Sequence, residues 1–131
     1  SGASSFGQKA AAVALESDHT PTDEMVKAFH QRRDLIINLL EQIPLLLVNR
    51  PQGAFYIFPD VSAYFGRTST GGYHVKDADD MSLYLLAEAR VSTVSGVAFG
   101  NEKCIRLSYA TSDEKLKDAA ERIRKALSIL I

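Results

Sequence analysis

One arginine stands out among the residues that could do chemistry. Arg106 lies inside the segment IRLSYA, where apolar side chains recur at Ile105, Leu107 and Tyr109. This alternation predicts a β-strand with one buried face. Arginine is almost never buried without a partner, and its guanidinium matches a carboxylate through two parallel hydrogen bonds. Arg106 is therefore either an anchor for a small-molecule carboxylate or half of an ion pair within the domain, and the strand pattern alone favours the ion pair.

Other motifs that could carry chemistry fit structural roles better. The segment GVAFG (96–100) lacks the Lys-Ser/Thr ending of a phosphate-binding loop and leads into a strand, so it predicts a turn between strands. Three scattered histidines and a single cysteine, Cys104, predict no metal site and a buried structural thiol. Asp77, Asp79 and Asp80 lack the glycine and distal glutamate of a calcium loop, and helix capping explains them.

The composition bounds the class of protein. A chain of 131 residues with 46% hydrophobic and 24% charged residues is typical of one globular domain. The net charge of −1 offers no basic excess for nucleic acid or an anionic membrane. No apolar run approaches the roughly 20 residues that span a bilayer. We expect a cytoplasmic protein that binds neither nucleic acid nor membrane, and one cysteine fits a reducing compartment.

Helix signals are clear at several points in the chain. Ser5 and Gln8 have the spacing of a capping box, and Pro21 suits a first helical position. Pro44 ends the long apolar stripe that follows. Asp77 and Ser112 are expected to cap two later helices. The closing helix has apolar residues at spacings of four and three: Leu116, Ala120, Ile123, Leu127 and Leu130.

The elements expected from these signals alternate in type along the chain. Buried or β-branched runs predict the strands. The order α-α-β-β-α-β-β-α predicts an α/β fold of the α+β kind, with a small sheet of three to four strands covered by helices. Expected helices are 6–16, 21–43, 78–89 and one after Ser112, and expected strands are 45–48, 54–58, 91–95 and 104–110.

Three longer segments follow one another in the chain: PQGAFYIFPDV (51–61), DDMSLYLLAEARVSTVSGVAFG (79–100) and IRLSYATSDEKLKDAAERI (105–123). In this order they resemble the C-terminal part of a class I aminotransferase. The resemblance is strongest to the aspartate aminotransferase branch, whose enzymes use pyridoxal phosphate and have fold type I. The opening SGASSFGQKAAAVAL also resembles the stretch that follows the cofactor lysine region of that family.

The resemblance implies a role for Arg106. By its place in IRLSYA it corresponds to the arginine that grips the α-carboxylate of the amino-acid substrate. The family's Schiff-base lysine would lie upstream of this chain, and Lys9 is not that lysine. We therefore expect no catalytic or cofactor-binding residue here, and an inactive chain when isolated. The family usually has proline where Ser95 stands, which would loosen the turn and leave Arg106 in place.

The resemblance also implies a domain organisation. Residues 1–20 would be the end of the large, cofactor-binding domain, and 21–131 the C-terminal small domain, with 21–43 as a long interdomain helix. Arg32, Arg33 and the first helix would face the missing large domain. The full-length protein would be a homodimer acting on amino acids and 2-oxo acids. Two alternatives stay open: a non-catalytic module that binds an amino acid or carboxylate, and a pyridoxal-phosphate lyase of the same fold.

Overall fold

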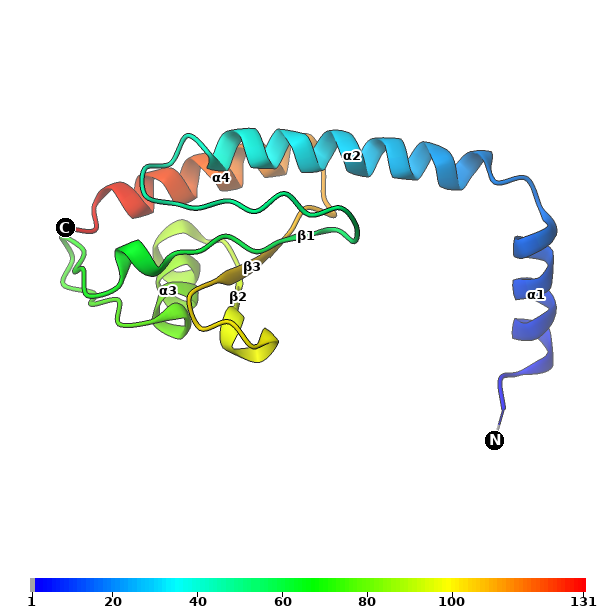
Figure 1. Ribbon diagram of the computed structural model, residues 1–131, viewed down its shortest axis with the longest axis horizontal. Coiled ribbons are helices and arrows are strands. Elements are labelled where there is room, and N and C mark those ends of the chain that lie inside the picture. The colour runs from blue at the N-terminus through cyan, green and yellow to red at the C-terminus, as the bar shows by residue number, and fades with distance from the viewer. Residues whose placement is uncertain (1) are drawn as a thin grey trace.

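The chain folds into a small antiparallel sheet packed against helices, with one further helix standing apart (Figure 1). The computed structural model describes residues 2–131. Three single turns, η1, η2 and η3, connect the longer elements. The elements, in chain order, are α1 (Ser5–Glu16), α2 (Thr20–Leu40), β1 (Tyr56–Ile57), η1 (Ser62–Tyr64), α3 (Ala78–Tyr84), η2 (Leu85–Ala89), β2 (Val94–Ser95), η3 (Gly96–Phe99), β3 (Ile105–Ser108) and α4 (Asp113–Ser128).

The sheet has three strands in the order β1-β3-β2, so β3 is the central one. Both neighbours run antiparallel to it, with Tyr56 opposite Ser108 and Val94 opposite Arg106. Because successive side chains of a strand point to opposite faces, Arg106 lies on one face and the residues beside it on the other. The predicted α+β class, with a small sheet covered by helices, is confirmed.

The core lies between the buried face of the sheet and three helices. The apolar stripe predicted for the closing helix is buried: four of its residues lie on α4, and Leu130 lies just beyond the end of that helix. Helix α2 contributes only its second half, through Ile36, Ile37 and Leu40. The predicted caps of α3 and α4 are present: the Asp77 carboxylate accepts a hydrogen bond from the Asp80 amide at 2.9 Å, and the Ser112 hydroxyl accepts one from the Lys115 amide at 3.4 Å. This core makes the sheet and its helices one packed body.

The segment 45–48 is not the buried strand that its four apolar residues predict. Leu45 has a φ of 67° and is 50% exposed, while Leu47 is 68% exposed and makes a single bridge to Asp60. Only Leu46 enters the core. The preceding helix ends at Leu40 instead of reaching residue 43, and the chain then turns sharply, so consecutive apolar side chains cannot share one face.

Two other expectations differ in detail. The helix expected over 78–89 is regular only to Tyr84 and continues as a wider π-turn, which Arg90 ends with a φ of 54°. At the start, the hydroxyl of Ser5 does not cap α1, because Ser4 holds the cap position without a side-chain bond. The amide of Gln8 instead donates to the Ala3 carbonyl at 2.8 Å.

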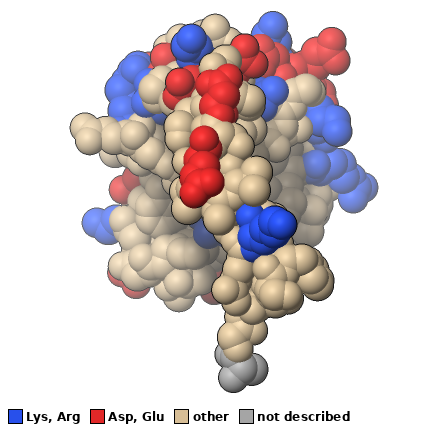
Figure 2. Space-filling view, turned by 90° about the vertical axis from the view of Figure 1, so that its right-hand side faces the viewer, with Lys and Arg blue, Asp and Glu red and all other residues tan. Residues whose placement is uncertain are grey.

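Helix α1 touches no part of the core. None of its residues is buried, and Phe6 and Leu15 are 81% and 76% exposed. Figure 1 shows it beyond the far end of α2, away from the sheet. Figure 2 looks onto this end of the molecule, where uncharged side chains cover most of the helix. An alanine-rich helix with exposed apolar residues lacks the packing that normally stabilises a helix.

Candidate functional site

Arg106 projects from the middle of the sheet onto its open face. Its neighbours on β3, Ile105 and Leu107, are 2% and 7% exposed and face the core. Arg106 is only half-buried, and Ser108 on the same face is exposed. The strand pattern therefore predicted correctly that the arginine lies opposite the buried side chains. It did not predict that the strand is the central one and not an edge.

The guanidinium of Arg106 has no acidic partner within residues 2–131. The ion pairs and hydrogen bonds of that part of the chain do not include it. Its Cζ lies instead 4.2 Å from the ring centre of Tyr56 and 4.1 Å from that of Phe99. The internal ion pair that the sequence alone favoured is thus not formed. Stacking on ring faces leaves the N–H groups at the edge of the guanidinium free to donate.

The segment GVAFG carries Phe99 to this position. It forms η3, a turn between β2 and β3, as predicted. The Gly96 amide donates to the Cys104 carbonyl at 2.8 Å, and the Asn101 amide donates back to the Gly96 carbonyl at 3.0 Å. The Ser95 hydroxyl accepts a hydrogen bond from the Val97 amide at 3.3 Å. The Ser95 side chain therefore caps the turn.

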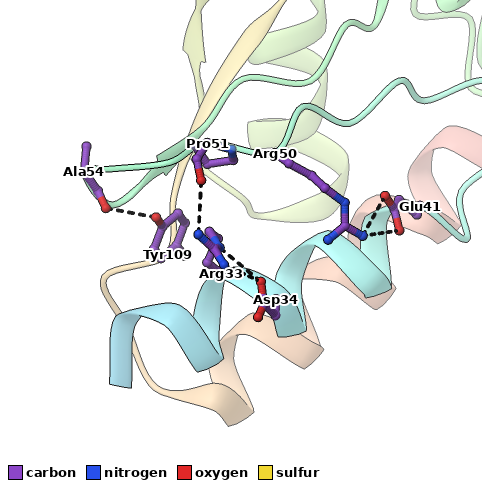
Figure 3. A network of polar contacts seen from close by, with 7 residues as sticks. All are labelled: Arg33, Asp34, Glu41, Arg50, Pro51, Ala54 and Tyr109. Atoms are coloured by element: carbon purple, nitrogen blue, oxygen red, sulfur yellow. Dashed lines mark hydrogen bonds and ion pairs between the residues drawn. The ribbon is translucent and has the colours of Figure 1, made fainter. Parts of the chain in front are cut away.

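Three contacts fix the loop that precedes β1 (Figure 3). The guanidinium of Arg33 donates to the Pro51 carbonyl at 3.3 Å, and the Tyr109 hydroxyl donates to the Ala54 carbonyl at 2.9 Å. Arg50 pairs with Glu41 of the helix at 3.2 Å. These contacts hold the loop against α2 and so place the following strand, with Tyr56, beside Arg106.

The two arginines of α2 that we expect to face a large domain are partly exposed and have partners in this chain. Arg33 also pairs with Asp34 at 2.9 Å, and its side chain is 25% exposed. Arg32 pairs with Asp113 at the start of α4, at 3.6 Å, and its Cζ lies 5.7 Å from the Phe29 ring centre. Both arginines thus have partners within the described residues. Asp34 and Phe29 are near neighbours in sequence, whereas Pro51 and Asp113 lie 18 or more residues away and could not be inferred from spacing.

The remaining candidates have the structural roles expected of them. Cys104 is buried, and burial raises the pKa of its thiol, so it is a structural thiol. Over residues 2–131 there is no group of histidine, cysteine and acidic side chains that could hold a metal. Within the same range no helix is long and apolar enough to cross a membrane. Arg106 is the remaining candidate for binding chemistry on this face.

One cavity lies away from Arg106. It measures 470 Å³ and lies between the ends of α2 and α4, where Arg67 and Arg124 line it. Arg67 donates to the Leu130 carbonyl, and Arg124 is paired with Glu121 at 2.7 Å, so these side chains already have partners. Arg106 does not line this cavity. The face around it is open and would form a closed site only against a second wall.

Comparison with known proteins decides the family. The sequence profile described as aminotransferase class I and II matches residues 1–123. The chain belongs to this family of aminotransferases. It is 42% identical over 130 residues to the bifunctional aspartate aminotransferase and glutamate/aspartate-prephenate aminotransferase of Petunia hybrida, a match that covers 97% of this chain and 27% of the relative. An aspartate aminotransferase of Pinus pinaster is 39% identical over 133 residues, 99% of this chain and 27% of its own.

Solved aminotransferase structures have the same fold. The crystal structure of the aspartate aminotransferase from Rhizobium meliloti matches with a TM-score of 0.93 and 40% identity, over 98% of this chain and 32% of that one. The aromatic aminotransferase from Pyrococcus horikoshii matches with a TM-score of 0.80 and 38% identity, over 92% and 31%. The chain therefore spans about a third or less of the length of the aminotransferases that it matches.

The described residues do not fit pyridoxal phosphate, the cofactor expected from the resemblance. A lysine that holds such a cofactor as an imine is desolvated in a pocket, and every lysine of this chain is exposed. Lys9 lies on α1, away from the sheet that carries Arg106. Among the described residues, Arg106 is a candidate for binding substrate, and no lysine offers a desolvated site for the cofactor.

Proposed function

We propose that this chain is the substrate-binding part of a pyridoxal-phosphate-dependent aminotransferase, in which Arg106 binds the α-carboxylate of the amino acid. The full-length protein would transfer an amino group between an amino acid and a 2-oxo acid. The observation that carries the proposal is a half-buried guanidinium on an open face, stacked on two rings and without an acidic partner in residues 2–131. Its unused donors match the two oxygens of a carboxylate.

The names of the relatives support aspartate as the amino donor. The proteins of Petunia hybrida and Pinus pinaster are both named aspartate aminotransferases, and the solved structure from Rhizobium meliloti carries the same name. A second carboxylate, on the substrate side chain, would need a further cation. That group would come from outside these residues, because the described strands β1, β2 and β3 carry no arginine or lysine besides Arg106.

Arg106 would orient the substrate as well as attract it. A guanidinium holds a carboxylate by two hydrogen bonds in one plane, whereas an ammonium group acts as a point charge. Fixing the carboxylate plane fixes the direction of the bonds at the α-carbon, and an oriented ground state lowers the entropic part of the barrier. Because Arg106 stands on the central strand, both neighbouring strands hold its backbone in place.

We also propose a division of the chain at residue 20. Residues 1–20 would belong to a large domain that binds the cofactor, and 21–131 would form the small domain, with α2 as the connector. In support, α1 buries nothing in this body, and its exposed apolar residues need a partner surface. The rest of the polypeptide and a second subunit, in a homodimer, would cover α1 and close the face around Arg106.

Kinetics of the full-length protein test the role of Arg106. Truncating a buried charged clamp costs on the order of 2–5 kcal/mol, so Arg106→Ala should raise KM for aspartate at least roughly thirtyfold. Arg106→Lys should recover only part of this loss, because it keeps the charge without the planar pair of donors. Arg124→Ala removes the same charge from a surface pair and serves as the control. An unchanged KM in Arg106→Ala would remove this residue from the site.

The same assay separates the alternatives. A non-catalytic module would bind the amino acid without forming a 2-oxo acid, and a lyase would release a product without needing a 2-oxo acid as acceptor. Transfer that depends on both substrates would exclude both readings. Absence of any transfer by the full-length protein with added pyridoxal phosphate would refute the proposed activity.

A further inference from the structure

The two rings beside Arg106 come from opposite sides of the central strand. Tyr56 stands on β1, opposite Ser108 and therefore diagonal to Arg106 across the strand pair. Phe99 stands at the end of η3, the turn that follows β2 on the other side. Their ring centres lie 4.2 and 4.1 Å from the Arg106 Cζ. Two separate elements therefore converge on one guanidinium.

The surrounding structure holds each ring where it is. Phe58, next but one to Tyr56 on the same chain segment, meets the Phe99 ring edge-on, at 6.1 Å between centres and 85° between planes. This geometry is a favourable one for aromatic pairs. Phe55, the residue before Tyr56, packs its ring against the Tyr56 ring, with 4.5 Å between the ring centres. The rings thus form two pairs, Phe55–Tyr56 and Phe58–Phe99, and Arg106 contacts one ring of each pair.

We propose that Tyr56 and Phe99 are positioning residues that hold the Arg106 guanidinium ready for a carboxylate. This inference rests on the proposed function of Arg106. An acidic neighbour could also hold the side chain, but it would occupy the same N–H donors that the substrate needs and cancel the charge. Ring faces attract a guanidinium without using those donors. The aromatic pair therefore orders Arg106 and leaves its charge and its hydrogen bonds for the ligand.

Ordering the arginine in advance has a measurable consequence. A long, free side chain loses rotamer freedom when it binds a ligand, and this loss weakens binding. Where rings hold the guanidinium beforehand, the loss occurs on folding instead. Removing either ring should therefore weaken ground-state and transition-state binding alike, which raises KM and leaves kcat nearly unchanged.

Six variants of the full-length protein test this proposal. Tyr56→Leu and Phe99→Leu should each raise KM for aspartate about three- to tenfold, the range expected for a cation–π contact. Tyr56→Phe and Phe99→Tyr keep the rings and should have nearly wild-type KM. Phe65→Leu removes a partly buried ring that packs on the core elsewhere and is the control for general loss of packing. Phe99→Leu in an Arg106→Ala background should add nothing, because no guanidinium remains to be held.

The outcomes separate this proposal from the function on which it rests. Wild-type KM in both leucine variants, together with a raised KM in Arg106→Ala, would overturn the positioning role alone. An unchanged KM in Arg106→Ala would overturn both. If the leucine variants do not fold, NMR of the wild-type protein tests the proposal instead. Ring currents from Tyr56 and Phe99 should shift the Arg106 Nε proton resonance upfield of those of the other arginines. A resonance at the ordinary position would overturn the positioning role.

Discussion

Gly96 is the residue on which the turn before β3 depends. A Cβ built at this position would lie 2.2 Å from the Asn101 carbonyl oxygen and 2.4 Å from that of Cys104. Both are backbone atoms, so no side-chain rotation can make room. Gly96→Ala must therefore shift the turn and weaken the two hydrogen bonds that close it. Overpacking of this kind costs about 1–3 kcal/mol and each hydrogen bond about 1 kcal/mol.

We expect Gly96→Ala to lower the free energy of unfolding by about 2–4 kcal/mol. Urea unfolding followed by far-ultraviolet circular dichroism measures the change. Gly53→Ala, where nothing lies within 4 Å of the added Cβ, should change stability little. Gly100→Ala is equally uncrowded but has a φ of +78° and should cost about 1 kcal/mol. The reasoning is refuted if Gly96→Ala is as mild as Gly53→Ala.

Two further perturbations test a helix cap and an ion pair. Asp77→Ala removes the carboxylate that accepts from the Asp80 amide at 2.9 Å and should cost about 1 kcal/mol in urea unfolding, whereas Asp79→Ala, without a capping bond, should cost less. Hydrogen bonds from Arg124 lower the pKa of Glu121 to about 2, from a usual value of 4.5. Because the folded pKa is the lower one, the stabilisation is present above the unfolded pKa and is lost as the pH falls toward 2. Carbon NMR titration should show the low midpoint, and Arg124→Gln should move it toward 4.5; an equal midpoint in both proteins would contradict the assigned cause.

The fold could be predicted from the sequence where a residue pattern is compatible with only one kind of secondary structure. Pro21 at a first helical position and the spaced apolar residues of α4 allow little besides a helix, and both helices are present. The four apolar residues 45–48 are compatible with more than one backbone conformation. Their pattern fits a strand, but the positive φ of Leu45 turns two side chains to solvent, and nothing in a leucine signals that conformation.

The candidate site was predictable only in part for a similar reason. Alternation along IRLSYA indicates which face of the strand Arg106 occupies, and the structure agrees. Whether an acid faces it depends on residues far away in the chain, and no spacing reports on them. Tyr56 and Phe99 lie 50 and 7 residues from Arg106, and only the register of β1 and the course of η3 bring them together. The one sequence feature that could have indicated these two rings is the aromatic residues in the segments AFYIF (54–58) and GVAFG (96–100).

The projecting helix α2 and the packed body that carries Arg106 suggest how this chain would move within a larger protein. Helix α2 has 21 residues, about 31 Å at 1.5 Å per residue, and its buried residues all lie in its second half. Residues 20–27 are all exposed and project beyond the core as an arm with α1 at its end (Figure 1). The strand that bears Arg106 and the second half of α2 share one core. Tyr56 stands on a strand paired with β3, and Phe99 stands on the turn that is hydrogen-bonded to Cys104, just before β3. Any rotation of this body about the arm would carry the arginine and its rings together, so closure over a substrate would preserve the geometry of the clamp.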